Sequence, residues 1–129
     1  MPDPTRVLVV DDSDVVRDLI TLNLELEGLC VTCAEDGQQA LDLVKALSPH
    51  VITLDVMMPR LDGFETASAL RDDPETAHIP IVMVTGRSAL ADMERGEALG
   101  VDAYLAKPFE PAELVSVVRS LARSGRRPV

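Results

Sequence analysis

Five polar side chains of this sequence stand at or near the ends of apolar runs: Asp11, Asp12, Asp55, Thr85 and Lys107. If these runs are strands of one parallel sheet, the five groups converge on a single edge of that sheet. Three carboxylates that lie close together repel one another, so they cannot all stay ionised unless protons or a cation intervene. Mg²⁺ is a suitable cation, because it accepts one or two carboxylates and keeps coordination positions open for phosphate oxygens.

A metal ion, an ammonium group and a hydroxyl around a carboxylate could stabilise the oxygens of a transferring phosphoryl group. Asp55 is the best candidate for the nucleophile, since it ends a central apolar run and the segment from Val56 to Pro59 supplies no competing group. Taken singly, each residue has a plainer interpretation: an Asp after a strand is commonly a helix cap, and a Lys before a Pro is commonly on the surface. The whole set favours phosphoryl chemistry.

The apolar runs predict the strands that must position these groups. Three runs are nearly continuous, as expected for central parallel strands covered on both faces: Val7 to Val10, Val51 to Leu54 and Ile81 to Val84. Two runs are weaker and more mixed, which is typical of edge strands: Leu29 to Cys33 and Val101 to Leu105, with Asp102 inside the latter.

Helical patterns separate the runs. Four helices are predicted to begin at a capping residue or a proline: Ser13, Asp36, Asp62 and Pro111. The first helix has its apolar positions at Val15, Val16, Leu19, Ile20 and Leu26. A further helix, roughly from Ser88 to Leu99, has a thin apolar stripe, so we expect it to be loosely held.

This alternation predicts an α/β fold, a doubly wound five-stranded parallel sheet with helices on both faces. Right-handed crossovers and the two outer strands favour the strand order 2-1-3-4-5. In a sheet of this order, ligands bind beyond the carboxyl ends of the strands, at the switch point between the first and third strands. That is the edge on which the five polar groups converge.

Composition excludes several classes of protein. The length fits one domain, and 22 acidic against 12 basic residues give a net charge of -10, which would repel a nucleic acid. No apolar stretch is long enough to cross a membrane and the start lacks the features of an export signal, so we expect a cytoplasmic protein. Cys30 and Cys33 would point to opposite faces of a strand, which disfavours a shared metal or disulfide.

At this point the sequence resembles the receiver domains of bacterial two-component response regulators, which have a flavodoxin-like fold. The matching motifs are Val9-Val10-Asp11-Asp12-Ser13, Asp55-Val56-Met57-Met58-Pro59, Leu61-Asp62-Gly63, Val84-Thr85-Gly86 and Lys107-Pro108-Phe109. The match runs from about Thr5 to Ala122. We therefore expect a receiver domain over residues 1–123, with 124–129 as a tail or the start of a linker.

The resemblance implies a role for each acidic residue. Asp55 would accept a phosphoryl group from the phosphohistidine of a sensor histidine kinase or of a histidine phosphotransfer protein. Asp12 and Asp55 would bind Mg²⁺ directly, Asp11 would bind it through water, and the backbone carbonyl of Met57 would be a further ligand. Mn²⁺ could substitute for Mg²⁺.

The resemblance also implies a switch. Thr85 and Lys107 would bind the phosphoryl oxygens, and Tyr104 would turn inward as Thr85 moves toward the phosphate. The Lys107-Pro108 peptide bond would be cis. The fourth helix, fifth strand and fifth helix would then form the output face, which signals to a partner protein or to a C-terminal output domain; the protein would be a monomer or a phosphorylation-dependent dimer.

Two alternatives remain open from the residues alone. A phosphatase with an Asp nucleophile needs a second Asp two residues on, where this chain has Met57, and a flavin carrier needs a hydroxyl-rich phosphate loop where this chain is acidic. A phosphoacceptor switch that is not an enzyme fits better. Neither Met57 nor Arg87 could orient an attacking water, so we expect slow hydrolysis of the acyl phosphate.

Overall fold

The structure is a computed structural model, and it describes residues 4–86 and 90–125. Its sheet has five parallel strands in the order β2-β1-β3-β4-β5, which confirms the predicted fold and strand order. The strands are β1 (Arg6–Val10), β2 (Cys30–Ala34), β3 (Val51–Leu54), β4 (Ile81–Thr85) and β5 (Ala103–Ala106). As predicted, β2 and β5 are the edge strands.

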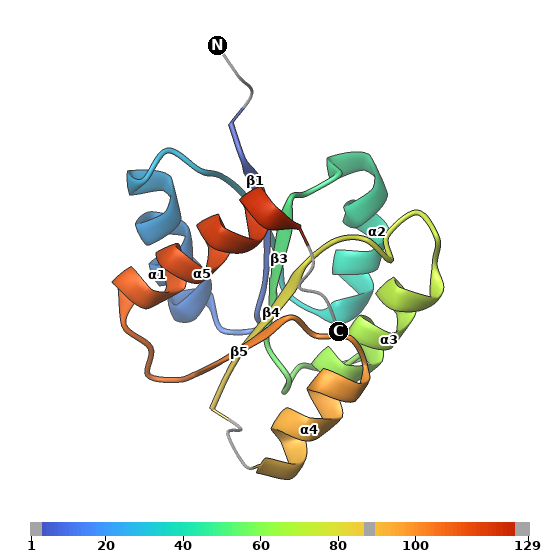
Figure 1. Ribbon diagram of the computed structural model, residues 1–129. Coiled ribbons are helices and arrows are strands. Elements are labelled where there is room, and N and C mark those ends of the chain that lie inside the picture. The colour runs from blue at the N-terminus through green and yellow to red at the C-terminus, as the bar shows by residue number, and fades with distance from the viewer. Residues whose placement is uncertain (1–3, 87–89, 126–129) are drawn as a thin grey trace.

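Helices cover both faces of the sheet (Figure 1). One face carries α1 (Asp14–Leu26) and α5 (Pro111–Ser124), and the other carries α2 (Gly37–Leu47), α3 (Gly63–Asp72) and α4 (Leu90–Ala98). Alternation along each strand divides the core accordingly. On β1, Val7 and Val9 pack with α1 and α5, whereas Leu8 and Val10 pack with α2 and α3.

The predicted helix starts are confirmed. The Ser13 hydroxyl accepts from the backbone N–H of Val16, and the Asp36 carboxylate accepts from that of Gln39 at 2.8 Å. At the start of α3, Asp62 and Glu65 form a reciprocal capping box. Pro111 is the first residue of α5, where its missing N–H has no cost.

The predicted apolar face of α1 is only partly correct. Ile20 and Leu24 are fully buried, and the side chain of Val16 is half-buried against the core. Three of the five predicted apolar positions, Val15, Leu19 and Leu26, are exposed, as is Leu22; their exposed fractions are 76, 45, 74 and 56%. Because only one stripe of α1 faces the sheet, its second apolar stripe is left on the surface.

Asp102 does not lie within the fifth strand, which begins one residue later. Its buried carboxylate accepts from the backbone N–H of Ile81 and pairs with Arg71 at 2.9 Å. The Arg71 guanidinium also donates to the carbonyls of Ala77, Ile79 and Gly100. A buried ion pair is tolerated only when its remaining donors are satisfied, and here it ties the end of α3 to the starts of β4 and β5.

Arg95 and Gly96 are among the residues through which α4 contacts the rest of the molecule. The Arg95 guanidinium lies 4.2 Å from the centre of the Phe64 ring on α3. Gly96 is buried, and a Cβ there would lie within 3.8 Å of Met83 and Tyr104. The other α4 side chains that the structure describes are exposed or half-buried, which agrees with the predicted thin stripe; Ser88 lies outside the described residues.

None of the described helices has the length and apolar character needed for a bilayer crossing.

Gly63 brings the start of α3 against the end of β3. Its N–H donates to the carbonyl of Val56 at 2.8 Å, and a Cβ on Gly63 would lie 2.8 Å from the Cα of Val56 and closer still to the carbonyl oxygen of Asp55. Real side chains do not approach backbone atoms this closely. The absence of a side chain at Gly63 therefore sets how near α3 comes to Asp55.

We expect Gly63→Ala to destabilise the protein by about 1–3 kcal/mol, because the atoms that its methyl group would meet belong to the backbone and cannot turn aside. Chemical denaturation followed by circular dichroism measures the change. Gly86→Ala is the matched control, since nothing lies within 4 Å of a Cβ at that position. Equal stabilities of the two variants would contradict this account of Gly63.

Candidate functional site

Four of the five predicted groups stand at the carboxyl ends of four different strands. Asp11 is the first residue after β1, Asp55 the first after β3, Thr85 the last of β4 and Lys107 the first after β5. In a parallel sheet these strand ends lie side by side, so the topology alone brings the groups together. Asp12 joins them because it is the next residue after Asp11.

Three carboxylates meet at this edge. Asp11, Asp12 and Asp55 each offer an oxygen, and these oxygens lie within 4.8 Å of one another. Asp11 and Asp55 are buried, at 1 and 6% exposure, whereas Asp12 is exposed. This donor set fits Mg²⁺, a hard ion that takes oxygen ligands and keeps several of its waters, because Asp12 leaves the site open to solvent.

Lys107 brings a positive charge to the same edge. Its Nζ lies 2.8 Å from Oδ2 of Asp11 and 3.5 Å from Oδ2 of Asp55. Its backbone N–H donates to the carbonyl of Thr85, which continues the ladder between β4 and β5. The Lys107–Pro108 peptide bond is cis, as predicted. The ammonium therefore bridges two of the three carboxylates.

The Asp55 carboxyl is in an environment that disfavours its charge. Burial first, and the negative charge of Asp11 second, raise its pKa above the ordinary value for an aspartate. The Lys107 ammonium, a hydrogen bond from the Thr85 hydroxyl and the backbone N–H of Val56 at 2.8 Å oppose that rise without cancelling it. A further cation at this site would complete the compensation.

Asp11 is fixed on every side. Its Oδ1 accepts from the backbone N–H of Ser13 at 2.9 Å, and its Oδ2 accepts from Lys107. Its backbone carbonyl accepts from the Arg17 guanidinium at 2.7 Å, and Arg17 also pairs with Asp14. The sequence reasoning missed Arg17; the available signal was its spacing of three from Asp14 in the first turn of a capped helix.

The remaining predicted site residues lie around this group. The Met57 side chain is 59% exposed, two residues after Asp55. Tyr104, on β5, is half-buried and packs against the core on the side of α2 and α3. Arg87 lies outside the described residues. The roles assigned to Met57 and Tyr104 stay predictions.

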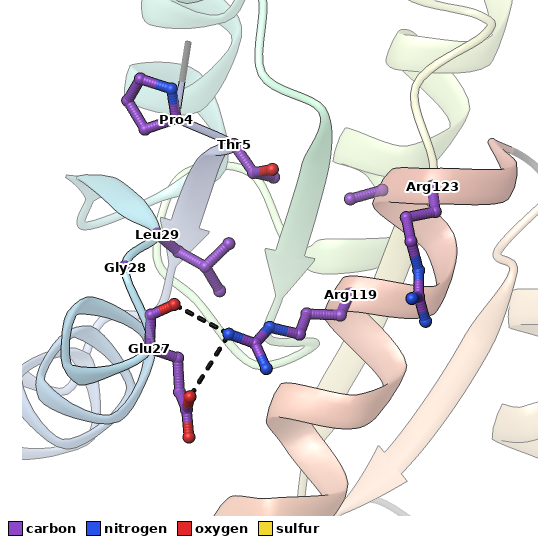
Figure 2. A pocket seen from close by; sticks show the side chains of 8 residues that line it. Pro4, Thr5, Glu27, Gly28, Leu29, Arg119 and Arg123 are labelled. Carbon is purple, nitrogen blue, oxygen red and sulfur yellow. Dashed lines mark hydrogen bonds and ion pairs between the residues drawn. The ribbon is translucent and has the colours of Figure 1, made fainter. Parts of the chain in front are cut away.

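A hollow at the amino ends of the strands takes no part in this site (Figure 2). Its volume is about 440 Å³, and Pro4, Gly28 and Leu29 are among the residues that line it. Within it, the Arg119 guanidinium donates to the carbonyl and the carboxylate of Glu27. The predicted site residues and this hollow therefore lie at opposite ends of the strands.

Comparison with known proteins identifies the family. The model of the response regulator receiver domain matches residues 7–119. The chain is 41% identical over 118 residues to a DNA-binding dual master transcriptional regulator, RpaA, of Synechocystis, a match that covers 92% of this chain and 49% of that protein. It is 42% identical over 120 residues to the response regulator MprA of Mycolicibacterium vanbaalenii, covering 93 and 51%. This chain thus spans about half the length of the curated relatives it matches.

Solved structures agree. The chemotaxis protein CheY4 of Vibrio cholerae superposes with a TM-score of 0.87 at 33% identity, covering 92% of this chain and 98% of that one. The receiver domain of a sensor histidine kinase from Pseudomonas aeruginosa, with a magnesium ion coordinated in its active site cleft, has a TM-score of 0.87 at 30% identity, covering 95 and 100%. By fold, acidic site and sequence, the chain belongs to the response regulator receiver domain family, whose members are phosphoacceptor switches.

Proposed function

We propose that Asp55 of this receiver domain accepts a phosphoryl group from a phosphohistidine on a sensor histidine kinase or a histidine phosphotransfer protein. One observation carries the proposal: the Asp55 carboxylate lies with two other carboxylates within 4.8 Å, and an ammonium stands 3.5 Å away. In the transfer, a bond forms between an Asp55 oxygen and phosphorus while the bond from phosphorus to the imidazole nitrogen breaks. Both electrons of the broken bond leave with the imidazole.

The surrounding residues divide the work. Asp12 and Asp55 would hold Mg²⁺ directly, with the Met57 carbonyl as a further ligand, and the ion would supply positive charge beside the phosphoryl oxygens. Asp11 acts through water, in keeping with the two hydrogen bonds that its oxygens already accept. Lys107 and Thr85 hold the oxygens of the transferred group. Mn²⁺ can replace Mg²⁺, because it prefers the same oxygen ligands.

The signal then passes to the face formed by α4, β5 and α5. Movement of Thr85 toward the phosphoryl group makes room for Tyr104 to turn inward, and partners read the change. We assign residues 1–123 to the receiver and 124–129 to a tail or the start of a linker. The relatives are about twice as long, so the receiver signals either to a partner protein or to a further C-terminal domain. We further propose that it is cytoplasmic and that it is a monomer or a phosphorylation-dependent dimer.

We expect Mg²⁺ and acetyl phosphate to add one phosphoryl group to the wild-type protein and none to Asp55→Asn, because the amide is not a nucleophile. Intact mass spectrometry measures the addition. Asp72→Asn, which removes an exposed carboxyl at the end of α3, is the matched control and should be labelled like the wild type.

Equal labelling of wild type and Asp55→Asn would contradict the assignment of the phosphoacceptor, and turnover of acetyl phosphate without stable labelling would favour a phosphatase. The decay of the label tests slow hydrolysis. With the apolar Met57 two residues after Asp55, we expect the label to last for minutes or longer; a lifetime of seconds would contradict this.

Without metal, Asp55→Asn should be more stable than the wild type at pH 7, by on the order of 1 kcal/mol or about 4 °C in Tm. The raised pKa means that ionised Asp55 costs the folded state free energy. As the pH falls through the folded-state pKa, the wild-type carboxyl becomes protonated and the advantage of the amide shrinks. Thermal unfolding in a chelator between pH 7 and pH 4 measures both effects.

Mg²⁺ should reverse this order. At 100 times its dissociation constant it adds about 2.7 kcal/mol to the wild type, since it binds the folded state only, and much less to Asp55→Asn. A metal-free Asp55→Asn variant that is less stable than the wild type at pH 7 would show that the carboxylate charge is fully compensated without metal.

The exposed stripe on α1 suits a helical partner. Val15, Leu19, Leu22 and Leu26 are spaced four, three and four residues apart, which is the spacing of a coiled-coil seam. The helix begins two residues after Asp12, so a partner helix along this seam reaches the acidic edge. We assign the seam to the phosphohistidine-bearing helix of the donor protein, because transfer requires that helix to lie beside Asp55.

Leu22→Glu is therefore expected to slow transfer from a phosphorylated histidine kinase at least tenfold and to leave labelling by acetyl phosphate unchanged. The kinase is the one that labels the wild type fastest in a survey of candidates, and transfer is followed by quench flow. Met93→Glu changes an exposed apolar side chain on α4 and is the control. If Leu22→Glu slowed labelling by the kinase and by acetyl phosphate equally, the substitution would act on the phosphoacceptor site and not on docking of the kinase.

A further inference from the structure

The segment between Asp55 and Gly63 contains a residue with an unusual backbone. Arg60 has a φ of 68°, in the left-handed region that non-glycine residues adopt at a cost of roughly 1 kcal/mol. Such a conformation persists when surrounding contacts hold it, and it is found preferentially near functional sites. The contacts of the Arg60 side chain are therefore candidates for what holds this backbone in place.

The Arg60 guanidinium binds the first turn of another helix. Its Nε and Nη2 both donate to Oδ2 of Asp36, at 3.1 Å for Nε. Asp36 is buried, and its other oxygen accepts the backbone N–H of Gln39 as the N-cap of α2. One carboxylate thus caps α2 with one oxygen and holds Arg60 with the other.

A second contact joins the same two parts of the chain. A Cβ on Gly37, the first residue of α2, would lie 2.6 Å from the carbonyl oxygen of Leu61. The hydrogen bonds from Leu61 N–H to the Pro59 carbonyl and from Gly63 N–H to Val56 only close the segment on itself. The ion pair and the Gly37 contact, in contrast, fix the segment against the start of α2.

We infer that the Asp36–Arg60 ion pair is a positioning clamp for the metal site. It holds the segment 56–62, and with it the backbone of Met57, in the place where the Met57 carbonyl can complete the coordination of Mg²⁺. Arg60 and Asp36 do not touch the metal; they act through the backbone of that segment. The inference rests on the proposed function, since it concerns the affinity of that same site.

Two substitutions remove the clamp with little other change. Glycine takes the left-handed backbone without strain, so Arg60→Gly keeps the loop conformation available. Asparagine accepts the Gln39 N–H, so Asp36→Asn keeps the helix cap. We expect each variant to raise the dissociation constant for Mg²⁺ several-fold, up to roughly tenfold, as measured by isothermal titration calorimetry. The double variant should be no weaker than the single ones, because both remove the same contact.

The directions of the changes separate the clamp from a simple charge effect. If only long-range charge acted, loss of the Arg60 cation would tighten Mg²⁺ binding and loss of the Asp36 anion would weaken it. Opposite changes, or unchanged affinity in both variants, would overturn the clamp. Failure of the wild-type protein to bind Mg²⁺ would overturn the proposed function and the clamp together.

Arg119→Gln and Glu27→Gln provide the control. They break an exposed ion pair at the opposite edge of the sheet (Figure 2) and should leave the affinity for Mg²⁺ unchanged. Thermal unfolding in a chelator shows whether each variant is folded. A fall in Mg²⁺ affinity in these control variants as large as that in Arg60→Gly would assign the effect to general stability and overturn the clamp.

Discussion

Repulsion among three carboxylates is the constraint on which the rest of this structure depends. Asp11 and Asp55 are buried, and in the part of the chain that the structure describes one ammonium, that of Lys107, lies against both. Charges held in a poorly hydrated place cost free energy unless opposite charges or hydrogen bonds offset them. Among the described residues, three carboxylates therefore stand beside one ammonium, and this excess of negative charge favours a bound cation.

Keeping these carboxylates close together requires a rigid frame. The two cores on either side of the sheet fix the strands, and the strands fix the carboxyl edge. In the connections beyond that edge that the structure describes, Val56 still packs in the core. Local contacts also hold these connections: Ser13 and Arg17 on Asp11, the close approach of Gly63 to the end of β3, and the pairing of Arg60 with Asp36. Each of these contacts involves few atoms and restricts one segment of the chain.

The sequence was sufficient to predict the fold, the strand order and the groups that meet at the site, because these follow from periodicity and from where strands end. It was insufficient wherever the outcome depends on distance in three dimensions. Asp102 looked like a strand residue because nothing in the local pattern shows that Arg71, far away in the sequence, lies beside it. The exposed stripe of α1 was missed for the same reason, since periodicity counts apolar positions but does not say how many neighbours cover them.

The attachment of α4 determines how easily that helix can move. Apart from buried Gly96, its described residues are exposed or half-buried, and one of its contacts with α3 is the Arg95 guanidinium over the Phe64 ring. The free energy needed to displace a helix grows with the apolar area uncovered, at about 25 cal/mol per Å². Most described side chains of α4 are exposed, whereas Leu114, Val118 and Leu121 of α5 are fully buried, so displacing α4 would uncover less apolar area than displacing α5.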